Sequence, residues 1–232
     1  MKIGTAVGTN DTFMIQRLRD LKKNGLLDYV ELYILPSATI DEIARWRESN
    51  LVEFCQAPHD DLAGINMDYL NIGAEVAKML GVKNIIFNAG ITIMTHDIPS
   101  HFWPETMPFK TSLGDLGSYA LPEEIMRDFC FDIAHGWITA RQTGVDPKVL
   151  FKEFIEKKPK HLHITDVKRE EDHLPLGTGD IDLDYVVELI HTFPNVTIET
   201  DHEKPDRWEN MVNDLKIFRK HYENRNNNTG KS

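Results

Sequence analysis

The chain has 232 residues, of which 41% are apolar and 27% charged, and its formal net charge is −11. This composition is typical of a globular domain with a sizeable core, and no apolar run is long enough to cross a membrane. The acidity argues against nucleic acid as a partner, because phosphate backbones repel a negatively charged chain. Two cysteines imply no disulfide framework, and the N-terminal stretch turns polar too early for a signal peptide, so a cytoplasmic location is expected.

Short apolar runs alternate with amphipathic segments along the first half of the chain. The patterns predict strands at 2–8, 29–34, 52–58 and 84–90, and helices at 12–25, 39–50 and 67–81. Thr39, followed three residues later by Glu42, forms a capping-box signature at the start of the second helix.

The same alternation continues in the second half after an irregular stretch at 91–108. The patterns predict strands near 101–105 and at 129–135, 161–167 and 196–201, and helices at 121–128, 146–159, 182–193 and 205–224. Asp146 and Pro147 mark the start of one of these helices. The polar tail 225–232 is expected to be disordered.

Eight strands in alternation with helices predict an α/β fold with a parallel sheet. In a chain of this length they favour a closed (β/α)₈ TIM barrel, formed by a single domain over residues 1–224, with an open doubly wound sheet as the alternative. The short segment between the fourth and fifth strands means that helix 4 is shortened or missing, or that the fifth strand is displaced. No phosphate-binding glycine motif follows the first strand, which argues against a nucleotide cofactor.

Acidic and imidazole side chains follow the apolar part of most predicted strands, at the end where the active site of such a barrel lies. A divalent cation would relieve their mutual repulsion and lost solvation, so the pattern predicts a metal site. His161 lies two residues before His163, deeper in the barrel or packed outward, and is not assigned to the site. The strand-end and loop residues are Glu31, His59, Asn88, Glu105, Asp132, His135, His163, Asp166, Arg169, Glu171, Asp172, His173, Glu199, Asp201 and His202.

Four motifs in this order resemble the xylose-isomerase-like barrels, a superfamily of sugar-phosphate isomerases and epimerases together with endonuclease IV. They are FCFDIAH (129–135), HLHITD (161–166), DHLPLGTGDID (172–182) and TIET (197–200). PETMP (104–108) is similar to a further motif, with Thr106 in place of the usual Asn, and Thr178 stands where Glu is usual. The resemblance extends over roughly residues 2–220.

The resemblance implies a metal site formed by Glu105, Asp132, His163 and Glu199, with His59, His135, Arg169 and His173 as substrate-binding residues. Three carboxylates and one imidazole favour Mn²⁺ or Mg²⁺, with Zn²⁺ as the alternative. The implied activity is a metal-dependent isomerase or epimerase acting on a small sugar, sugar phosphate or hydroxy-ketone through an enediolate. Glu105 and Glu199 would then exchange the proton.

Two other functions remain open. One is an endonuclease IV-like multinuclear phosphodiesterase, with additional metals held by His59, His135, Glu171 and His173. Against it, Asn88 stands where that enzyme has a bridging histidine. The other is a non-catalytic barrel of the same superfamily. The sequence does not determine the oligomeric state.

Overall fold

The barrel consists of eight parallel strands. The structure is a computed structural model that describes residues 1–58, 67–88, 98–108, 121–125, 127–199 and 206–229. The barrel strands are β1 (Lys2–Gly8), β2 (Tyr29–Tyr33), β3 (Val52–Gln56), β4 (Ile85–Asn88), β5 (Phe102–Glu105), β6 (Cys130–Asp132), β7 (His161–Ile164) and β10 (Asn195–Ile198). They close in the order β1-β10-β7-β6-β5-β4-β3-β2, which confirms the predicted α/β barrel.

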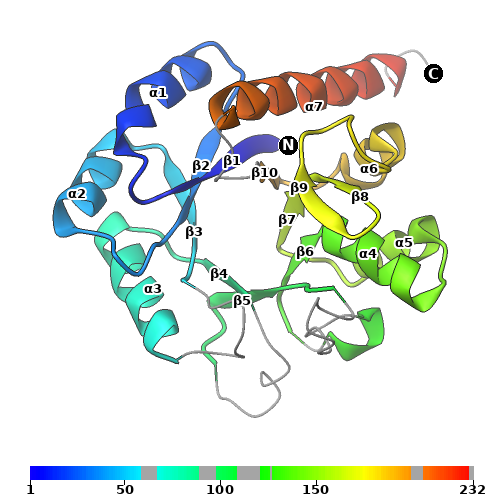
Figure 1. Ribbon diagram of the computed structural model, residues 1–232, viewed down its shortest axis with the longest axis horizontal. Coiled ribbons are helices and arrows are strands. Elements are labelled where there is room, and N and C mark those ends of the chain that lie inside the picture. The colour runs from blue at the N-terminus through cyan, green and yellow to red at the C-terminus, as the bar shows by residue number, and fades with distance from the viewer. Residues whose placement is uncertain (59–66, 89–97, 109–120, 126, 200–205, 230–232) are drawn as a thin grey trace.

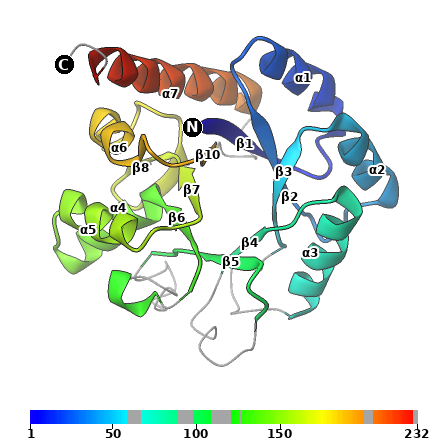
Figure 2. The ribbon, with the colours of Figure 1, turned by 180° about the vertical axis from the view of Figure 1, so that it is seen from behind.

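Helices cover the outside of this ring, as Figure 1 shows and Figure 2 shows from behind. An antiparallel hairpin of β8 (Asp166–Lys168) and β9 (Glu171–Leu174) follows β7. None of the described helices combines the length and apolarity needed to cross a membrane. The helices are η1 (Thr12–Met14), α1 (Ile15–Lys23), α2 (Ile40–Ser49), α3 (Met67–Leu80), η3 (Pro122–Glu124), α4 (Ile133–Thr143), α5 (Pro147–Glu156), α6 (Leu183–Ile190) and α7 (Arg207–Thr229).

The fifth strand takes its regular place in the barrel. β5 pairs with β4, and Asn88 lies opposite Glu105, so the strand is not displaced. The described residues between the two strands, 98–101, form no helix, and 89–97 lie outside the described residues.

Local capping chemistry forms where the sequence predicts it. The hydroxyl of Thr39 accepts a hydrogen bond from the N–H of Glu42, and the Glu42 carboxylate accepts one from the N–H of Thr39, which completes the capping box of α2. Asp146 caps α5, with Pro147 at its first position. These interactions depend on neighbours within four residues, which is why sequence patterns reveal them.

Several predicted boundaries are wrong. The strand predicted over 129–135 ends at Asp132, because the Asp132 carboxylate caps a helix that begins at Ile133. Within the helix predicted at 121–128, the described residues form only the short η3. At the C-terminus, α7 continues to Thr229, so residues 225–229 belong to the helix and not to a disordered tail.

The glycine-rich loop 175–181 folds around the buried carboxylate of Asp166. Its two oxygens accept hydrogen bonds from the N–H groups of Val167, Gly177, Gly179 and Ile181, at 2.8–3.2 Å. A Cβ on Gly179 would lie 2.4 Å from Asp166 Oδ1, so only glycine fits there. Asp166 was expected at the end of a barrel strand as a site residue, but it starts the hairpin and holds this loop instead.

We expect Asp166→Asn to lower the free energy of unfolding by about 3 kcal/mol, because an amide NH₂ would face backbone donors that now bind a carboxylate oxygen. Urea unfolding measures the change. Asp180→Asn, in the same loop but exposed, is the matched control and should cost less than about 1 kcal/mol. Equal effects in the two variants would contradict the role assigned to Asp166.

Candidate metal centre

The interior of the barrel changes from apolar to polar over two residues of five strands, β2 to β6. Tyr29, Phe54, Ile86 and Cys130 form a buried interior cluster, with Trp103 packed against it. Because side chains alternate along a strand, the residue two positions further on points to the same side, one layer closer to the C-terminal ends. These residues are Glu31, Gln56, Asn88, Asp132 and Glu105.

Four of the expected metal ligands converge in this polar layer. Glu105, Asp132, His163 and Glu199 each offer one ligand atom, and these atoms all lie within 4.8 Å of one another. Nδ1 of His163 is 3.2 Å from Oε1 of Glu105 and 3.3 Å from Oε1 of Glu199. All four side chains are buried. Strands β5, β6 and β7, and the first residue after β10, therefore supply one donor each.

Asp132 combines a structural and a free oxygen. Its Oδ1 accepts a hydrogen bond of 2.8 Å from the N–H of His135, which caps α4. Its Oδ2 is buried and has no hydrogen-bond partner among the described residues. The backbone of Asp132 is anchored as well, since its N–H donates to the Thr106 hydroxyl at 2.9 Å. The cap thus orients the carboxylate and leaves one oxygen for a ligand.

The donor set fits a divalent cation. Besides Asp132 Oδ2, His163 Nδ1 is a buried polar atom with no hydrogen-bond partner among the described residues, and both belong to the converging set. Buried polar atoms without partners are costly, and a cation bound between them would remove that cost. Three carboxylates and one imidazole suit Mn²⁺, Mg²⁺ or Zn²⁺, and the donor set does not choose among them.

The electrostatics of the carboxylates differ. Burial raises the pKa of Glu105, and the nearby charge of Glu199 adds to this effect. For Glu199, burial acts in the same direction, but His163 and His173 outweigh it and lower the pKa to about 2. Two carboxylates at one site with opposite pKa shifts are suited to different proton-transfer roles.

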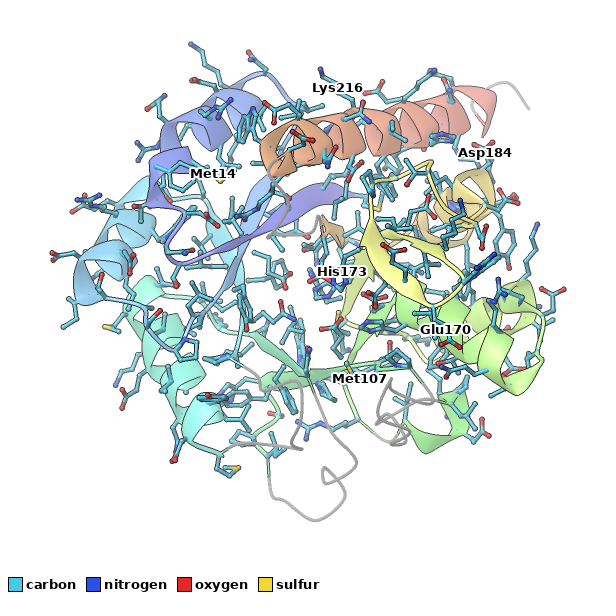
Figure 3. The ribbon with its side chains drawn as sticks, viewed as in Figure 1. Met14, Met107, Glu170, His173, Asp184 and Lys216 are labelled. Atoms are coloured by element: carbon cyan, nitrogen blue, oxygen red, sulfur yellow. The ribbon has the colours of Figure 1, made fainter. Side chains whose placement is uncertain are left out.

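A second cluster lies beside the first, at the mouth of the barrel. Asp172 bridges two imidazoles, with Oδ2 3.3 Å from Nε2 of His135 and Oδ1 3.0 Å from Nδ1 of His173. Nε2 of His173 is 3.6 Å from Oε2 of Glu199, and Figure 3 places His173 near the centre of the ring. Burial would lower the pKa of His135, but Asp132, Asp172 and Glu105 raise it to about 10.

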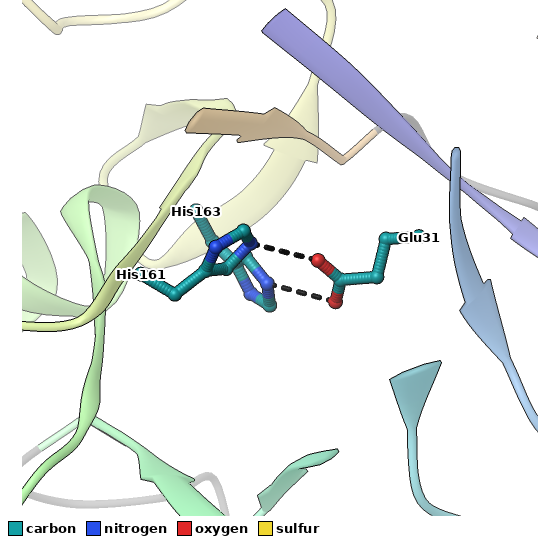
Figure 4. Close-up of side chains that lie close together, drawn as sticks. All are labelled: Glu31, His161 and His163. Atoms are coloured by element: carbon teal, nitrogen blue, oxygen red, sulfur yellow. Dashed lines mark hydrogen bonds and ion pairs between the residues drawn. The ribbon is translucent and has the colours of Figure 1, made fainter. Parts of the chain in front are cut away.

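A buried polar network that involves Glu31 adjoins the metal ligands. Its Oε1 is 3.0 Å from Nε2 of His163, and its Oε2 is 2.8 Å from Nε2 of His161, as Figure 4 shows. The hydroxyl of Thr197 donates to Oε2 at 2.8 Å. His161, which the sequence did not assign to the site, points into the barrel one layer below His163.

Several other expected site residues do not join the converging ligands or lie outside the described residues. Arg169 and Glu171 are exposed on the β8–β9 hairpin, and neither belongs to the converging set of ligands. His59, together with Asp201 and His202, lies outside the described residues. The carboxylate that contacts both His135 and His173 is Asp172, and not the neighbouring Glu171 that was expected to bind an additional metal.

Sequence reasoning missed Gln56 and gave no role to Asp172 and Glu31. Gln56 donates from Nε2 to Glu105 Oε2 at 3.1 Å and to Asn88 Oδ1 at 3.2 Å, and thus holds a metal ligand in place. Asp172 and Glu31 were noted only as strand-end or loop residues. Gln56 and Glu31 each lie two residues after an interior apolar side chain, and this spacing would have indicated both. Nothing local distinguishes Asp172 from Glu171.

Searches with the sequence give no match to a protein-family model or to a curated protein. The fold, however, is similar to that of solved structures over nearly the whole chain. Endonuclease IV from Thermus thermophilus is 14% identical, with a TM-score of 0.64 over 97% of this chain and 100% of that one.

Two further structures extend the comparison. The probable 3-DHS dehydratase AsbF from Bacillus anthracis is 12% identical, with a TM-score of 0.63 over 94% of this chain and 99% of that one. A xylose isomerase domain protein from Alicyclobacillus acidocaldarius is 13% identical, with a TM-score of 0.59 over 95% of this chain and 98% of that one. Together with the closed ring of eight parallel strands, these similarities show that the chain has a TIM-barrel fold like that of these structures.

Proposed function

We propose that the protein is a metal-dependent isomerase or epimerase that moves a proton next to the carbonyl of a small sugar, sugar phosphate or hydroxy-ketone. The observation that carries the proposal is the convergence of Glu105, Asp132, His163 and Glu199 at the C-terminal mouth of the barrel. Barrels of this fold include proteins described as sugar phosphate isomerases/epimerases. The net charge of −11 agrees with a small-molecule substrate better than with a duplex-DNA substrate.

The site residues divide into holding and proton-transfer roles. Asp132, His163 and the two glutamates would hold Mn²⁺, Mg²⁺ or Zn²⁺. When bound, the ion would supply positive charge that stabilises an enediolate. Glu199, whose pKa is lowered, is ionised at neutral pH and could accept the proton, and Glu105, whose pKa is raised, could carry a proton for its return.

Residues at the mouth would position the substrate oxygens. His135 is oriented by its Nδ1, which lies 2.7 Å from the Thr106 carbonyl oxygen and must donate to it, because a carbonyl only accepts. This leaves Nε2 facing Asp172 and the mouth. Arg169 and His173 come from the β8–β9 hairpin with φ angles of 63° and 55°. Such left-handed backbone costs about 1 kcal/mol for a residue with a side chain and is common at functional sites.

The test combines metal analysis with hydrogen exchange. The purified chain is loaded with Mn²⁺ or Mg²⁺ and incubated in D₂O with a panel of ketoses, aldoses and their phosphates. We expect about one bound metal per chain and deuterium at the carbon beside the carbonyl, detected by NMR. A loaded chain that exchanges no proton on any member of the panel would contradict the proposal.

An endonuclease IV-like phosphodiesterase is the second candidate, favoured by the cluster of His135, Asp172 and His173 beside the metal ligands. This function would require two or three metals per chain and cleavage of a phosphodiester, which the same metal analysis distinguishes. Asn88 argues against it, because its Oδ1 accepts from Gln56 and a neutral amide is a poor metal ligand. A chain that takes up no metal would instead indicate a non-catalytic barrel.

We expect metal affinity to increase with pH between about 6 and 8, by up to about tenfold per pH unit for each proton released. Burial lowers the pKa of His163, but Cys130, Glu199 and Glu31 together raise it well above 6.5. His163 therefore keeps a proton that the metal must displace, and a higher pH makes this easier. Calorimetry in two buffers with different ionisation enthalpies measures the protons released, and a pH-independent affinity would contradict the expectation.

A further inference from the structure

The Glu31 carboxylate contacts the side of His163 that faces away from the candidate metal centre. Nε2 of His163 lies 3.0 Å from Oε1 of Glu31, whereas Nδ1 lies 3.2 Å from Oε1 of Glu105 and 3.3 Å from Oε1 of Glu199. The two nitrogens of one ring thus face different carboxylates: Nε2 faces Glu31, and Nδ1 faces Glu105 and Glu199 of the metal centre. Figure 4 shows the contact with Glu31.

A neutral imidazole carries one proton, and its position decides which nitrogen can bind a metal. An ionised carboxylate only accepts hydrogen bonds, so the contact with Glu31 favours a proton on Nε2. Once a metal has displaced the second proton of the ring, the lone pair of His163 lies on Nδ1, the buried atom that has no hydrogen-bond partner among the described residues. This tautomer is the one that a metal at the candidate centre needs.

Glu31 is itself held rigidly. Its Oε2 accepts from the Thr197 hydroxyl at 2.8 Å and lies 2.8 Å from Nε2 of His161, and the Tyr29 hydroxyl lies 3.0 Å from the Thr197 hydroxyl. All these side chains are fully buried. A charged group in a barrel layer that usually holds branched apolar residues is costly to bury, which argues that it serves more than packing.

We propose that Glu31 is a positioning residue that fixes the tautomer and orientation of His163 and thereby sets the metal affinity of the centre. The inference rests on the proposed function, because it requires a metal bound by Nδ1 of His163. Contacts of this kind, from a carboxylate to the second nitrogen of a metal-binding histidine, typically change metal affinity by about 10- to 100-fold.

The first experiment compares the metal affinities of three proteins by calorimetry: the wild-type chain, Glu31→Gln, and Glu53→Gln as a matched control. Glu53 lies on the neighbouring strand β3 and forms a surface ion pair with Lys2. We expect Glu31→Gln to weaken Zn²⁺ and Mn²⁺ binding by about 10- to 100-fold, and Glu53→Gln to leave it unchanged. Equal affinity in Glu31→Gln and wild type would overturn the inference alone, whereas no binding by wild type would overturn the proposed function as well.

The second experiment needs no variant and therefore does not depend on the folding of Glu31→Gln. NMR of the chain with ¹⁵N-labelled histidine, loaded with diamagnetic Zn²⁺, reports which nitrogen of His163 carries the proton. We expect the proton on Nε2 and the metal on Nδ1. A metal on Nε2 would overturn the inference and would place the ion instead in the group of Glu31, His161 and His163.

Discussion

A divalent metal ion at about 100 times its dissociation constant should raise the melting temperature of the wild-type chain by roughly 5–10 °C. Binding to the folded state alone at this excess stabilises it by about 2.7 kcal/mol. For a chain of this size each kcal/mol corresponds to roughly 2–4 °C. The expectation follows from a buried site in which Asp132 Oδ2 and His163 Nδ1 have no hydrogen-bond partner among the described residues.

Asp132→Asn should remove most of this metal-induced shift and leave the fold intact. Asn caps helices as well as Asp, so its oxygen can keep the hydrogen bond from the N–H of His135. The second oxygen becomes an NH₂ group, which is no metal ligand. The ion then loses one carboxylate, although the fold loses little.

Asp146→Asn is the matched control, because Asp146 caps α5 and is not among the converging ligands. Both variants should fold with circular dichroism spectra like that of the wild type, and only Asp146→Asn should keep the full shift on addition of Mn²⁺ or Zn²⁺. A full shift in Asp132→Asn as well would show that the metal binds elsewhere, and the candidate centre would have to be abandoned.

Glu199→Gln should reduce turnover by about 10³-fold or more without unfolding the chain, since removal of a general base typically costs 10²- to 10⁴-fold. Gln has nearly the same size as Glu and can keep one oxygen near His163 Nδ1, where Glu199 Oε1 now lies at 3.3 Å. It cannot accept the substrate proton at neutral pH, because an amide is not a base in this range.

The measurement is deuterium exchange and product formation on whichever sugar the wild type accepts, at saturating metal so that weaker metal binding does not limit the rate. Glu170→Gln is the control, because Glu170 is exposed in the turn of the β8–β9 hairpin, away from the cluster (Figure 3). Turnover of Glu199→Gln at the wild-type rate would remove Glu199 from the proton-transfer step.

The two variants test different parts of the proposal. Asp132→Asn reports on metal binding and needs no substrate, whereas Glu199→Gln reports on the reaction. If Asp132→Asn loses the metal-induced shift but Glu199→Gln keeps wild-type turnover, the metal centre stands and Glu199 is not the base. Glu105, whose pKa is raised by burial, would then be the next residue to examine as the proton acceptor.

The sequence by itself determined the alternation of strands and helices, most of their positions, and several helix caps. These features depend on side-chain periodicity and on hydrogen bonds within three or four residues, as at Thr39 with Glu42 and at Asp146. It also indicated that acidic and imidazole side chains gather at one mouth of the barrel, because parallel strands place their C-terminal ends there. The choice of Glu105, Asp132, His163 and Glu199 among them came from the resemblance.

Only the tertiary structure decided which polar groups face one another across the barrel. Glu31 and His161 are 130 residues apart in sequence and meet because the closed ring turns the side chains of β2 and β7 into one shared interior. Asp172 contacts two imidazoles, whereas its neighbour Glu171 is exposed. Such contacts depend on strand register and barrel closure, which no local pattern of residues encodes.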